Sequence, residues 1–460
     1  MWSWEREKSA SELPHCQPLR ARKPLKQIGY TMVPHLVTAL TGPINELEQR
    51  ILDSMPSIER WFRLEWMEHT PLFYASVDVR NAGFKLAAVS TQLFPSGWNN
   101  LTPSMLPLAV QAAMAAIEKI CPEARNLLII PQNHSHSTAY WSSLAQLRSI
   151  FHMAGLNVCM GSISPNVKKS TVIDLPGGDT LTLEPVVRTR ARLGAKHFDP
   201  CTILLNHDLK AGVPGILEDL NEQYLLPPLH AASSVRLKST HLRCYEEVVK
   251  RFGKLIGVDA WLMNPLWETL PHVNAHVEAD QQRLRDAVEG MLSKVRKRYK
   301  EYGIKEKAFV VLKADNYDSS FHAVAVRDAK DLAPVWERLA AAQAAAYDEP
   351  PTLVLQEGVH TNERVNDAVA EPVVYLMDRY VVGGFYRVQP HTDGQERLGE
   401  SDASFVPLAF AESTHLPQPG LQPGASVPNR FYMYGVVSRL AMLAAAYELE
   451  STDPQAEHYE

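Results

Sequence analysis

The sequence predicts an α/β protein, with an N-terminal α/β domain, a mainly helical central segment and a C-terminal region of paired strands. Three observations indicate this class. Short apolar runs with strand character alternate with helical stretches between residues 126 and 205. Helical spacing dominates residues 215–300, and paired apolar runs return after Phe309. The chain has 460 residues, which is enough for two or three domains with substantial cores.

The N-terminal region lacks the apolar periodicity of a folded element. Residues 1–29 are polar, basic and proline-containing, with Arg20, Arg22, Lys23 and Lys26 close together. We expect a mobile basic extension. An arm that binds nucleic acid or a protein partner is the sharper alternative.

Composition excludes several classes of protein. Hydrophobic residues make up 45% and charged residues 21% of the chain, and the net charge is -6, so no global basic surface for nucleic acid or an anionic membrane is expected. Apolar runs are all much shorter than the roughly 20 residues of a membrane span. The five cysteines are scattered, with no C-x-x-C pair, which argues against a disulfide framework or a structural zinc site. We therefore expect a cytoplasmic protein without a membrane partner.

The N-terminal half contains the pattern of a small, mostly parallel sheet. Its strands are expected at residues 126–130, 156–163 and 201–205, with a helix at 140–153 between them. A separate strand at residues 72–79 and a helix ending near Ile120 precede this stretch. Ligands of such sheets gather beyond the carboxyl ends of the strands. His134, His136 and His207 lie there and are candidate metal ligands, although solvated or hydrogen-bonding histidines explain them better.

The C-terminal half contains a hairpin that carries a lysine. Residues 309–316 read Phe-Val-Val-Leu-Lys-Ala-Asp-Asn, so an apolar strand runs directly into Lys313. A second apolar run, residues 323–326, follows a short polar connection. Strand, lysine, loop and strand form an arrangement that many nucleotide enzymes use to cover phosphates. We also expect strands at residues 352–357 and 372–388 and a closing helix to Glu450.

Two groups of polar side chains are candidate sites. The first combines two cations with an amide and several carboxylates: Lys313, Gln356, Glu357, Glu371, Asp378 and Arg387. Such a set suits a triphosphate with magnesium, because carboxylates hold the metal while lysine and arginine bind phosphate oxygens. Pairing of these charges at the protein surface is the alternative.

The second group lies in loops at strand ends: Asp78, Arg80, Asn81, Lys85, Asn99 and Asn100. Arginine offers a planar fork for a carboxylate, so an amino-acid substrate is plausible. Fixed loop geometry explains the asparagines equally well.

Several longer segments resemble those of proteobacterial-type glutamate–cysteine ligases, from Tyr30 to about Glu450. They include residues 77–86 (Val-Asp-Val-Arg-Asn-Ala-Gly-Phe-Lys-Leu), 93–101 (Leu-Phe-Pro-Ser-Gly-Trp-Asn-Asn-Leu), 226–230 (Leu-Pro-Pro-Leu-His), 309–316, 356–375 and 380–388 (Tyr-Val-Val-Gly-Gly-Phe-Tyr-Arg-Val). This family uses ATP to join the γ-carboxyl group of glutamate to the amine of cysteine, the first step of glutathione synthesis. It is related to the ATP-grasp ligases.

The resemblance implies roles for the candidate residues. Lys313 and Arg387 would be catalytic and hold phosphate, and Gln356 and Glu357 would lie at the adenine and ribose edge of ATP. Glu371 and Asp378 would contact Mg²⁺. The amino-acid side would be lined by Arg80, Asn81, Lys85, Asn99 and Asn100.

It also implies a division of the chain. The predicted parts are the extension (1–29), an N-terminal α/β substrate-side domain (30–225), a mainly helical segment (226–305), an ATP-grasp-like nucleotide region (306–450) and a tail (451–460).

One loop departs from the family pattern. The family has a glycine-rich loop after Lys-Ala-Asp-Asn, whereas residues 317–322 here read Tyr-Asp-Ser-Ser-Phe-His. Glycine lets backbone N–H groups approach phosphate closely. Two alternatives to the ligase therefore stay open: a catalytically impaired paralogue that binds a ligand or an active ligase partner, and a ligase for other amino acids. A homo-oligomer is also compatible with the sequence.

Overall fold

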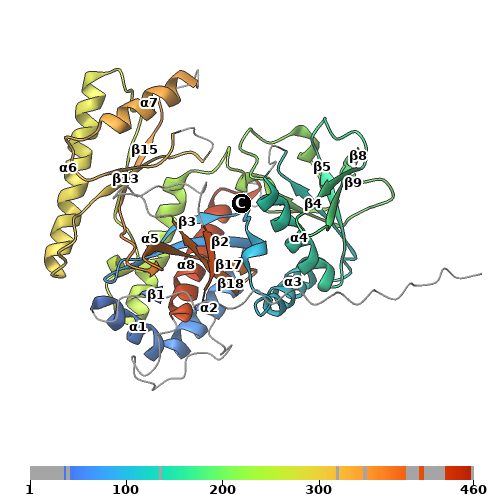
Figure 1. Ribbon diagram of the computed structural model, residues 1–460, viewed down its shortest axis with the longest axis horizontal. Helices are drawn as coiled ribbons and strands as arrows, with labels where there is room; N and C mark the ends of the chain where they lie inside the picture. The colour runs from blue at the N-terminus through green and yellow to red at the C-terminus, as the bar shows by residue number, and fades with distance from the viewer. Residues whose placement is uncertain are drawn as a thin grey trace, which may run out of the picture. The chain divides into compact units, whose positions relative to one another are not determined.

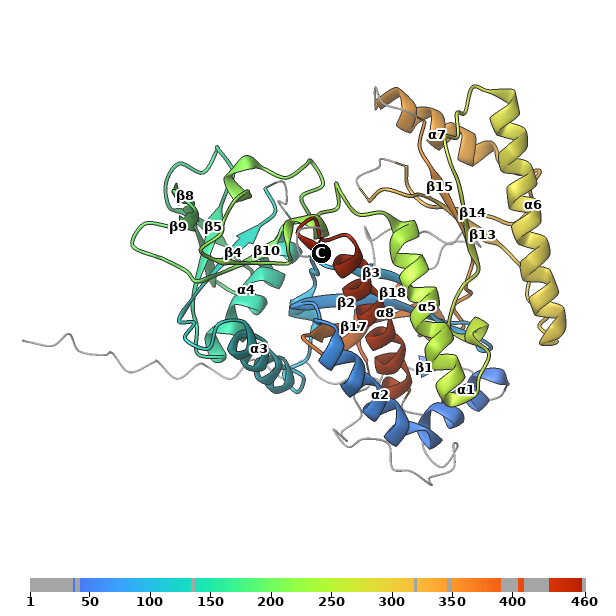
Figure 2. The same ribbon diagram turned by 180° about the vertical axis from the view of Figure 1, so that it is seen from behind.

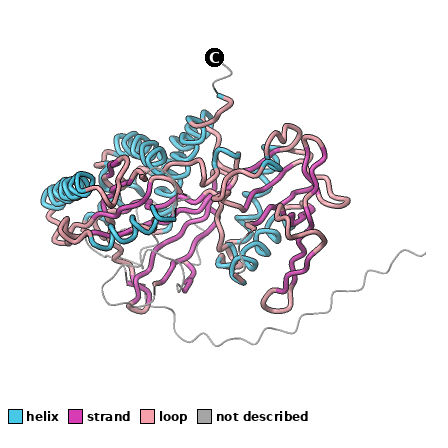
Figure 3. Tube along the Cα trace, turned by 90° about the horizontal axis from the view of Figure 1, so that it is seen from above, coloured by secondary structure: helices cyan, strands magenta, loops and turns pink. Residues whose placement is uncertain are grey.

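The computed structural model describes residues 36–37, 42–133, 137–317, 321–345, 350–389, 404–408 and 430–456. The predicted extension, residues 1–29, lies outside the described residues. Helices and strands alternate along the described chain, which confirms the α/β class (Figure 3). Among the described helices, none is both long enough and apolar enough to cross a lipid bilayer.

A seven-stranded antiparallel sheet, here the central sheet, joins strands that are far apart in the sequence (Figure 1). Its strands are β1 (Leu36–Val37), β2 (Tyr74–Asn81), β3 (Leu86–Gln92), β16 (Arg364–Val365), β17 (Ala368–Met377), β18 (Tyr380–Val388) and β19 (Ser404–Pro407). The hairpin β2–β3 pairs through β2 with β17, which also pairs with β18. Strands from the predicted substrate-side domain and the predicted nucleotide region thus share one sheet.

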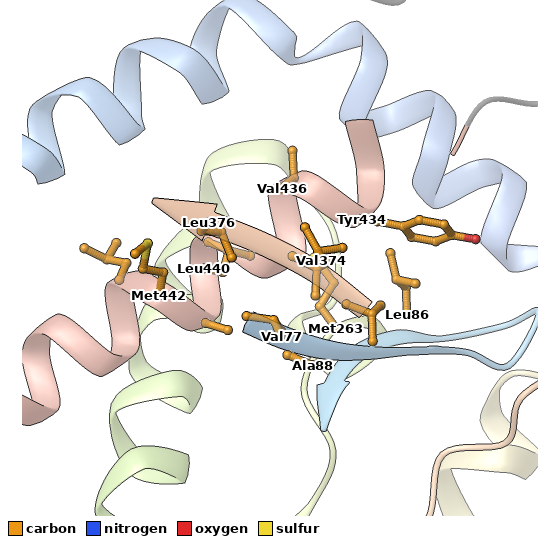
Figure 4. Packing of buried hydrophobic residues seen from close by; sticks show 14 of the residues in the cluster. Val77, Leu86, Ala88, Met263, Val374, Leu376, Tyr434, Val436, Leu440 and Met442 are labelled. Carbon is orange, nitrogen blue, oxygen red and sulfur yellow. The ribbon is translucent and has the colours of Figure 1, made fainter. Parts of the chain in front are cut away.

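Helices α8 (Phe431–Ser451) and α5 (Lys238–Ile256) pack together against the central sheet (Figure 2). Most side chains of α8 are buried, as expected for a helix that is apolar on all sides. Figure 4 shows Val77 of β2, Val374 of β17 and Leu440 of α8 in one cluster, and all three are completely buried. Helices α1 (Pro43–Asp53) and α2 (Met55–Glu68) contribute to the same core.

The small parallel sheet that the sequence predicts is confirmed. Its order is β11-β10-β4-β5-β7-β6, and only the β6–β7 pair is antiparallel. The strands are β4 (Asn126–Pro131), β5 (Asn157–Ser162), β6 (Thr171–Asp174), β7 (Thr180–Pro185), β10 (Thr202–Asn206) and β11 (Tyr224–Leu226). Helices α3 (Leu106–Ile120) and α4 (Thr138–Met153) share its core, and β8 (Val187–Thr189) and β9 (Arg192–Gly194) form a separate hairpin.

The third sheet has four antiparallel strands, and the predicted lysine hairpin lies in it. The order is β12-β15-β13-β14, with β12 (Trp267–Leu270), β13 (Val310–Ala314), β14 (Val324–Val326) and β15 (Leu353–Glu357). Helices α6 (Glu278–Glu301) and α7 (Ala333–Ala345) belong to this part of the fold, and α6 packs on the sheet. Strand β12 lies inside the segment expected to be mainly helical. It is a strand because it pairs with β15, and this pairing determines its conformation.

Candidate active site

A cleft of about 230 Å³, here the main cleft, lies where the central and four-stranded sheets approach each other. Its walls come from β2, β3, β13, β15, β17 and β18 and from residues beside them. The lining residues are Asp78, Arg80, Val89, Ser90, Val311, Lys313, Ala323, Gln356, Glu357, Val359, Glu371, Arg387 and Gln389.

Two arginines and two carboxylates meet in the main cleft. Arg80 Nη2 lies 2.7 Å from Glu371 Oε1. Arg387 Nη2 lies 3.0 Å from Glu371 Oε2 and 3.3 Å from Asp78 Oδ2. Burial alone would raise the pKa of Glu371, but the charges of Arg80 and Arg387 outweigh burial and lower that pKa. Glu371 is therefore ionised and orients both guanidinium groups.

Strand register explains why these four residues meet. Glu371 on β17 stands opposite Arg387 on β18, and Val373 stands opposite Asp78 on β2. Asp78 and Arg80 are two residues apart, so they lie on the same face of their strand. The two groups that the sequence suggests as separate sites are thus partly combined in one cleft.

Lys313 lies on the opposite wall, on β13. Its Nζ donates hydrogen bonds to Gln356 Oε1 at 2.8 Å and to the Val89 carbonyl at 3.3 Å. Burial lowers the pKa of Lys313 to about 8, and the nearby charge of Arg80 also lowers it. Gln356 Nε2 is buried and has no hydrogen-bond partner within the described chain, so it is available as a donor to a ligand.

Lys85 and Glu357 pair with each other behind the main cleft. Lys85 Nζ lies 2.8 Å from Glu357 Oε2, and both side chains are completely buried. The same oxygen accepts hydrogen bonds from Trp261 Nε1 at 3.0 Å and from the Leu266 amide at 2.9 Å. Lys85 is absent from the lining of the main cleft, whereas Glu357 is part of it.

The three asparagines predicted to bind substrate do not line the main cleft. Asn81 is completely buried, donates to Glu363 Oε1 at 3.2 Å and accepts from the Gly83 amide at 2.9 Å. These bonds hold the β2–β3 turn. Asn99 and Asn100 lie in the short 3-10 helix η1 (Trp98–Asn100), where Asn99 Nδ2 donates to Asn100 Oδ1 at 3.4 Å. Of the predicted amino-acid contacts, only Arg80 reaches the cleft.

Asp378 and Glu371 are not brought together. They are seven residues apart on an extended hairpin strand and its turn, which corresponds to roughly 23 Å. Asp378 lies at the β17–β18 turn, 3.7 Å from Lys119 Nζ and 3.8 Å from Arg379 Nε. The two carboxylates therefore cannot share one magnesium ion. The carboxylate that lies beside Glu371, on the other side of Arg387, is Asp78 and not the predicted Asp378.

The histidines considered as metal ligands do not form a metal site in the described residues. His207 is buried, and its Nδ1 accepts a hydrogen bond from the Leu209 amide at 3.0 Å. His134 and His136 lie outside the described residues. In the part of the chain that the structure describes, no three His, Cys, Asp or Glu side chains are grouped to hold a metal.

A smaller cavity of about 60 Å³, here the side pocket, adjoins the main cleft and was not predicted. It is lined by Ala88, Val89, Ser90, Thr91, Lys238, His241, Leu242, Tyr245, Lys313, Tyr317 and Gln356. Lys238 and His241 are three residues apart on α5 and so share a helix face, which is a weak signal in a sequence.

Aromatic residues hold both ends of the loop that lacks glycine. Tyr317 lies under Lys238 Nζ, 4.3 Å from its ring centroid, and under the Arg236 guanidinium at 4.7 Å. Phe321 is buried in the core of the four-stranded sheet. Residues 318–320 lie outside the described residues. Tyr317 and Phe321 thus anchor the two ends of this glycine-free loop.

Comparisons with known proteins indicate the family of this chain. The family model described as glutamate-cysteine ligase matches residues 48–449. The crystal structure of a provisionally named gamma-glutamylcysteine synthetase from Methylobacillus flagellatus KT is 46% identical, with a TM-score of 0.86, and the match covers 92% of this chain and 100% of that one. The comparison with curated proteins gave no match.

Two further solved structures are only distantly similar. They are D-alanyl-alanine synthetase A from Vibrio cholerae (12% identity, TM-score 0.30, covering 61% of this chain and 73% of that one) and a glutathione synthetase-like effector from Globodera pallida (10% identity, TM-score 0.35, covering 75% and 81%). Their TM-scores are too low to support an argument. The match of the family model over most of the sequence, together with the similarity to the Methylobacillus structure, shows that this chain belongs to the glutamate–cysteine ligase family.

Proposed function

We propose that this protein is an ATP-dependent ligase that joins the γ-carboxyl group of glutamate to the amine of cysteine. The observation that carries the proposal is the convergence of three cations, Arg80, Lys313 and Arg387, on one cleft. Because the chain belongs to the glutamate–cysteine ligase family, we infer that these cations serve the joining of a carboxylate to an amine. Cations from two facing sheets suit a ligand with several anionic groups, such as a triphosphate beside an amino acid.

The polar groups of the main cleft fit the phosphates of ATP. Arg387 and Lys313 offer N–H donors to phosphate oxygens, and the buried Gln356 Nε2 offers a further donor. Arg80 is the candidate contact for the glutamate substrate, because its planar fork matches a carboxylate.

The same cleft also fits Mg²⁺ bound together with ATP. Magnesium in such enzymes is usually held by one or two carboxylates, by phosphate oxygens and by water. Glu371 and Asp78 are the carboxylates in position, and both face Arg387. When bound, the ion would neutralise phosphate charge and orient the triphosphate.

In the proposed reaction, a γ-carboxylate oxygen of glutamate attacks the terminal phosphorus of ATP, and ADP leaves. The cysteine amine then attacks the acyl carbon and loses a proton as phosphate leaves. The cations act by positioning the reactants and by stabilising charge that develops on phosphate oxygens.

The proposal is tested by incubating the protein with ATP and Mg²⁺ and measuring the ADP that forms. Glutamate and cysteine are supplied together and separately. Mass spectrometry would identify γ-glutamylcysteine. Lys313→Ala should lose activity, because it removes a cation from the cleft. Lys119→Ala is the matched control, since Lys119 is half-exposed and lies outside the main cleft.

The same experiment separates the alternatives. Turnover with another amino-acid pair would indicate a ligase of different specificity. Binding of Mg·ATP in a calorimeter without turnover for any pair would contradict the proposal and favour a non-catalytic paralogue. Residues 317–322 lack glycine, so binding of Mg·ATP and turnover must be measured separately.

A further inference from the structure

Three buried side chains form a hydrogen-bonded chain beside the main cleft. Glu448 Oε2 on α8 lies 2.9 Å from Nδ1 of His241 on α5, and His241 Nε2 lies 3.0 Å from Oγ1 of Thr91 on β3. The exposed fractions are 1% for Glu448, 7% for His241 and 2% for Thr91, so bulk water does not compete for these bonds. The contacts proposed above for ATP, Mg²⁺ and glutamate do not include these three residues.

The proton positions follow from the chemistry of the partners. Burial would raise the pKa of Glu448, but Arg236 outweighs burial and the pKa falls to about 2. Both guanidinium bonds from Arg236 to the carboxylate are 2.7 Å long. An ionised carboxylate only accepts hydrogen bonds, so His241 Nδ1 carries a proton. In the neutral ring Nε2 is then an acceptor, and the Thr91 hydroxyl donates to it.

This chain ends at the side pocket. Thr91 and His241 line the pocket, which shares Lys313 and Gln356 with the main cleft. A volume of about 60 Å³ has room for roughly four to six water-sized groups, at 10–15 Å³ each. The pocket can therefore hold a small polar fragment, such as an amine on a short carbon chain, next to the phosphate-binding residues.

The charged and titratable groups around His241 come from several elements. They are Glu448 on α8, Arg236 before α5, Lys238 and Tyr245 on α5, Lys313 on β13 and Tyr317 after it. Among these, Glu448 is the partner that stabilises a positive charge on the imidazole ring. An imidazolium formed at His241 would share the Glu448 carboxylate, 2.9 Å from Nδ1, with the Arg236 guanidinium.

We infer that the side pocket receives the amino group of the acceptor amino acid, and that Thr91 and His241 take up the proton which its ammonium form loses before the neutral amine attacks the acyl carbon. The inference rests on the ligase activity proposed above. Thr91 Oγ1 accepts a proton from the substrate ammonium while its own proton passes to His241 Nε2. The products of the step are a neutral amine and an imidazolium, and the number of protons is conserved. Thr91 contacts the substrate, whereas His241 and Glu448 act through it.

The test separates the two half-reactions. Exchange of ¹⁸O between the β,γ-bridge and the β-phosphate of ATP, with glutamate but no acceptor, reports transfer of phosphate to glutamate. Ligation is then measured with cysteine and with hydroxylamine, a nucleophile that is largely uncharged at neutral pH. The variants are His241→Gln, Thr91→Val and the conservative control Thr91→Ser.

Both His241→Gln and Thr91→Val should keep the isotope exchange and the hydroxylamine reaction within about twofold of wild type. Ligation of cysteine should fall by about 10²-fold or more, the usual size of a proton-transfer contribution. The deficit should shrink as pH rises, because more of the cysteine amine is then already neutral. Thr91→Ser should retain ligation, since the hydroxyl remains.

Two results would overturn the inference while leaving the ligase activity intact. One is cysteine ligation at the wild-type rate in Thr91→Val, and the other is an equal loss with cysteine and hydroxylamine. Absence of exchange and of product in the wild-type protein would instead contradict the proposed function, and the inference with it. Thermal unfolding of each variant identifies any loss that comes from misfolding.

Discussion

Lys85 and Glu357 form an ion pair with Nζ 2.8 Å from Oε2, and neither side chain is exposed to solvent. Lys85 follows the turn between β2 and β3, while Glu357 ends β15. The pair therefore connects the central sheet to the four-stranded sheet, whose separation defines the main cleft. The sequence suggests these residues for two different ligands, and each instead has the other as its partner.

Lys85→Met should destabilise the protein by about 3–5 kcal/mol, because it leaves a buried carboxylate without its cation. Adding Glu357→Gln should restore part of this loss. The glutamine oxygen can still accept from Trp261 and Leu266 but carries no charge. Urea unfolding of both variants measures the difference. A double variant no more stable than Lys85→Met would show that the pair is not the cause.

The activity should depend on pH through Lys313. Burial lowers the pKa of Lys313 to about 8, so the free protein carries this charge below pH 8 and loses it above. The kcat/KM for ATP should therefore decline as pH rises through about 8. Lys313→Arg should remove this decline, because arginine stays protonated. Lys119→Arg, at a half-exposed lysine outside the cleft, should leave the profile unchanged.

Glu448 should make stability sensitive to acid. Its pKa falls from 4.5 to about 2 on folding, so its stabilising contribution is complete above pH 4.5 and is lost as pH falls toward 2. This shift corresponds to about 3 kcal/mol at neutral pH. Glu448→Gln should be less stable than wild type by about that amount at pH 7, and the two should converge as pH falls to about 2. Glu289→Gln, on an exposed helix face, should show no such trend.

Two glycines should respond to alanine with opposite signs. A Cβ atom at Gly358 would lie 2.1 Å from Cε2 of Phe309, so Gly358→Ala must displace a core ring. We expect a loss of about 1–3 kcal/mol. Gly290 lies on α6, and no described atom outside the helix's own backbone lies within 4 Å of the added carbon, so Gly290→Ala should stabilise the protein by about 0.5–1 kcal/mol. Denaturant midpoints test both, and a stabilised Gly358→Ala would contradict the close approach.

Local pattern was sufficient for many elements of the fold, although it missed strand β12. The apolar run before Lys313 predicted the β13–β14 hairpin, and alternating strands and helices predicted the parallel sheet around β4. These features depend on side-chain periodicity and turn chemistry, which neighbouring residues determine. Recognition of the family came from longer segments that contain the same strands.

The sequence by itself therefore determined the class of fold, the family and the three cations, Arg80, Lys313 and Arg387, that line the main cleft. Only the tertiary structure decided which charges are partners. The pairing of β2 with β17 places Arg80 and Asp78 beside Glu371, while the length of β17 separates Glu371 from Asp378. Strand register over hundreds of residues sets these distances, and local periodicity carries no information about it. The Glu448–His241–Thr91 chain was missed for the same reason, because three separate elements supply its members.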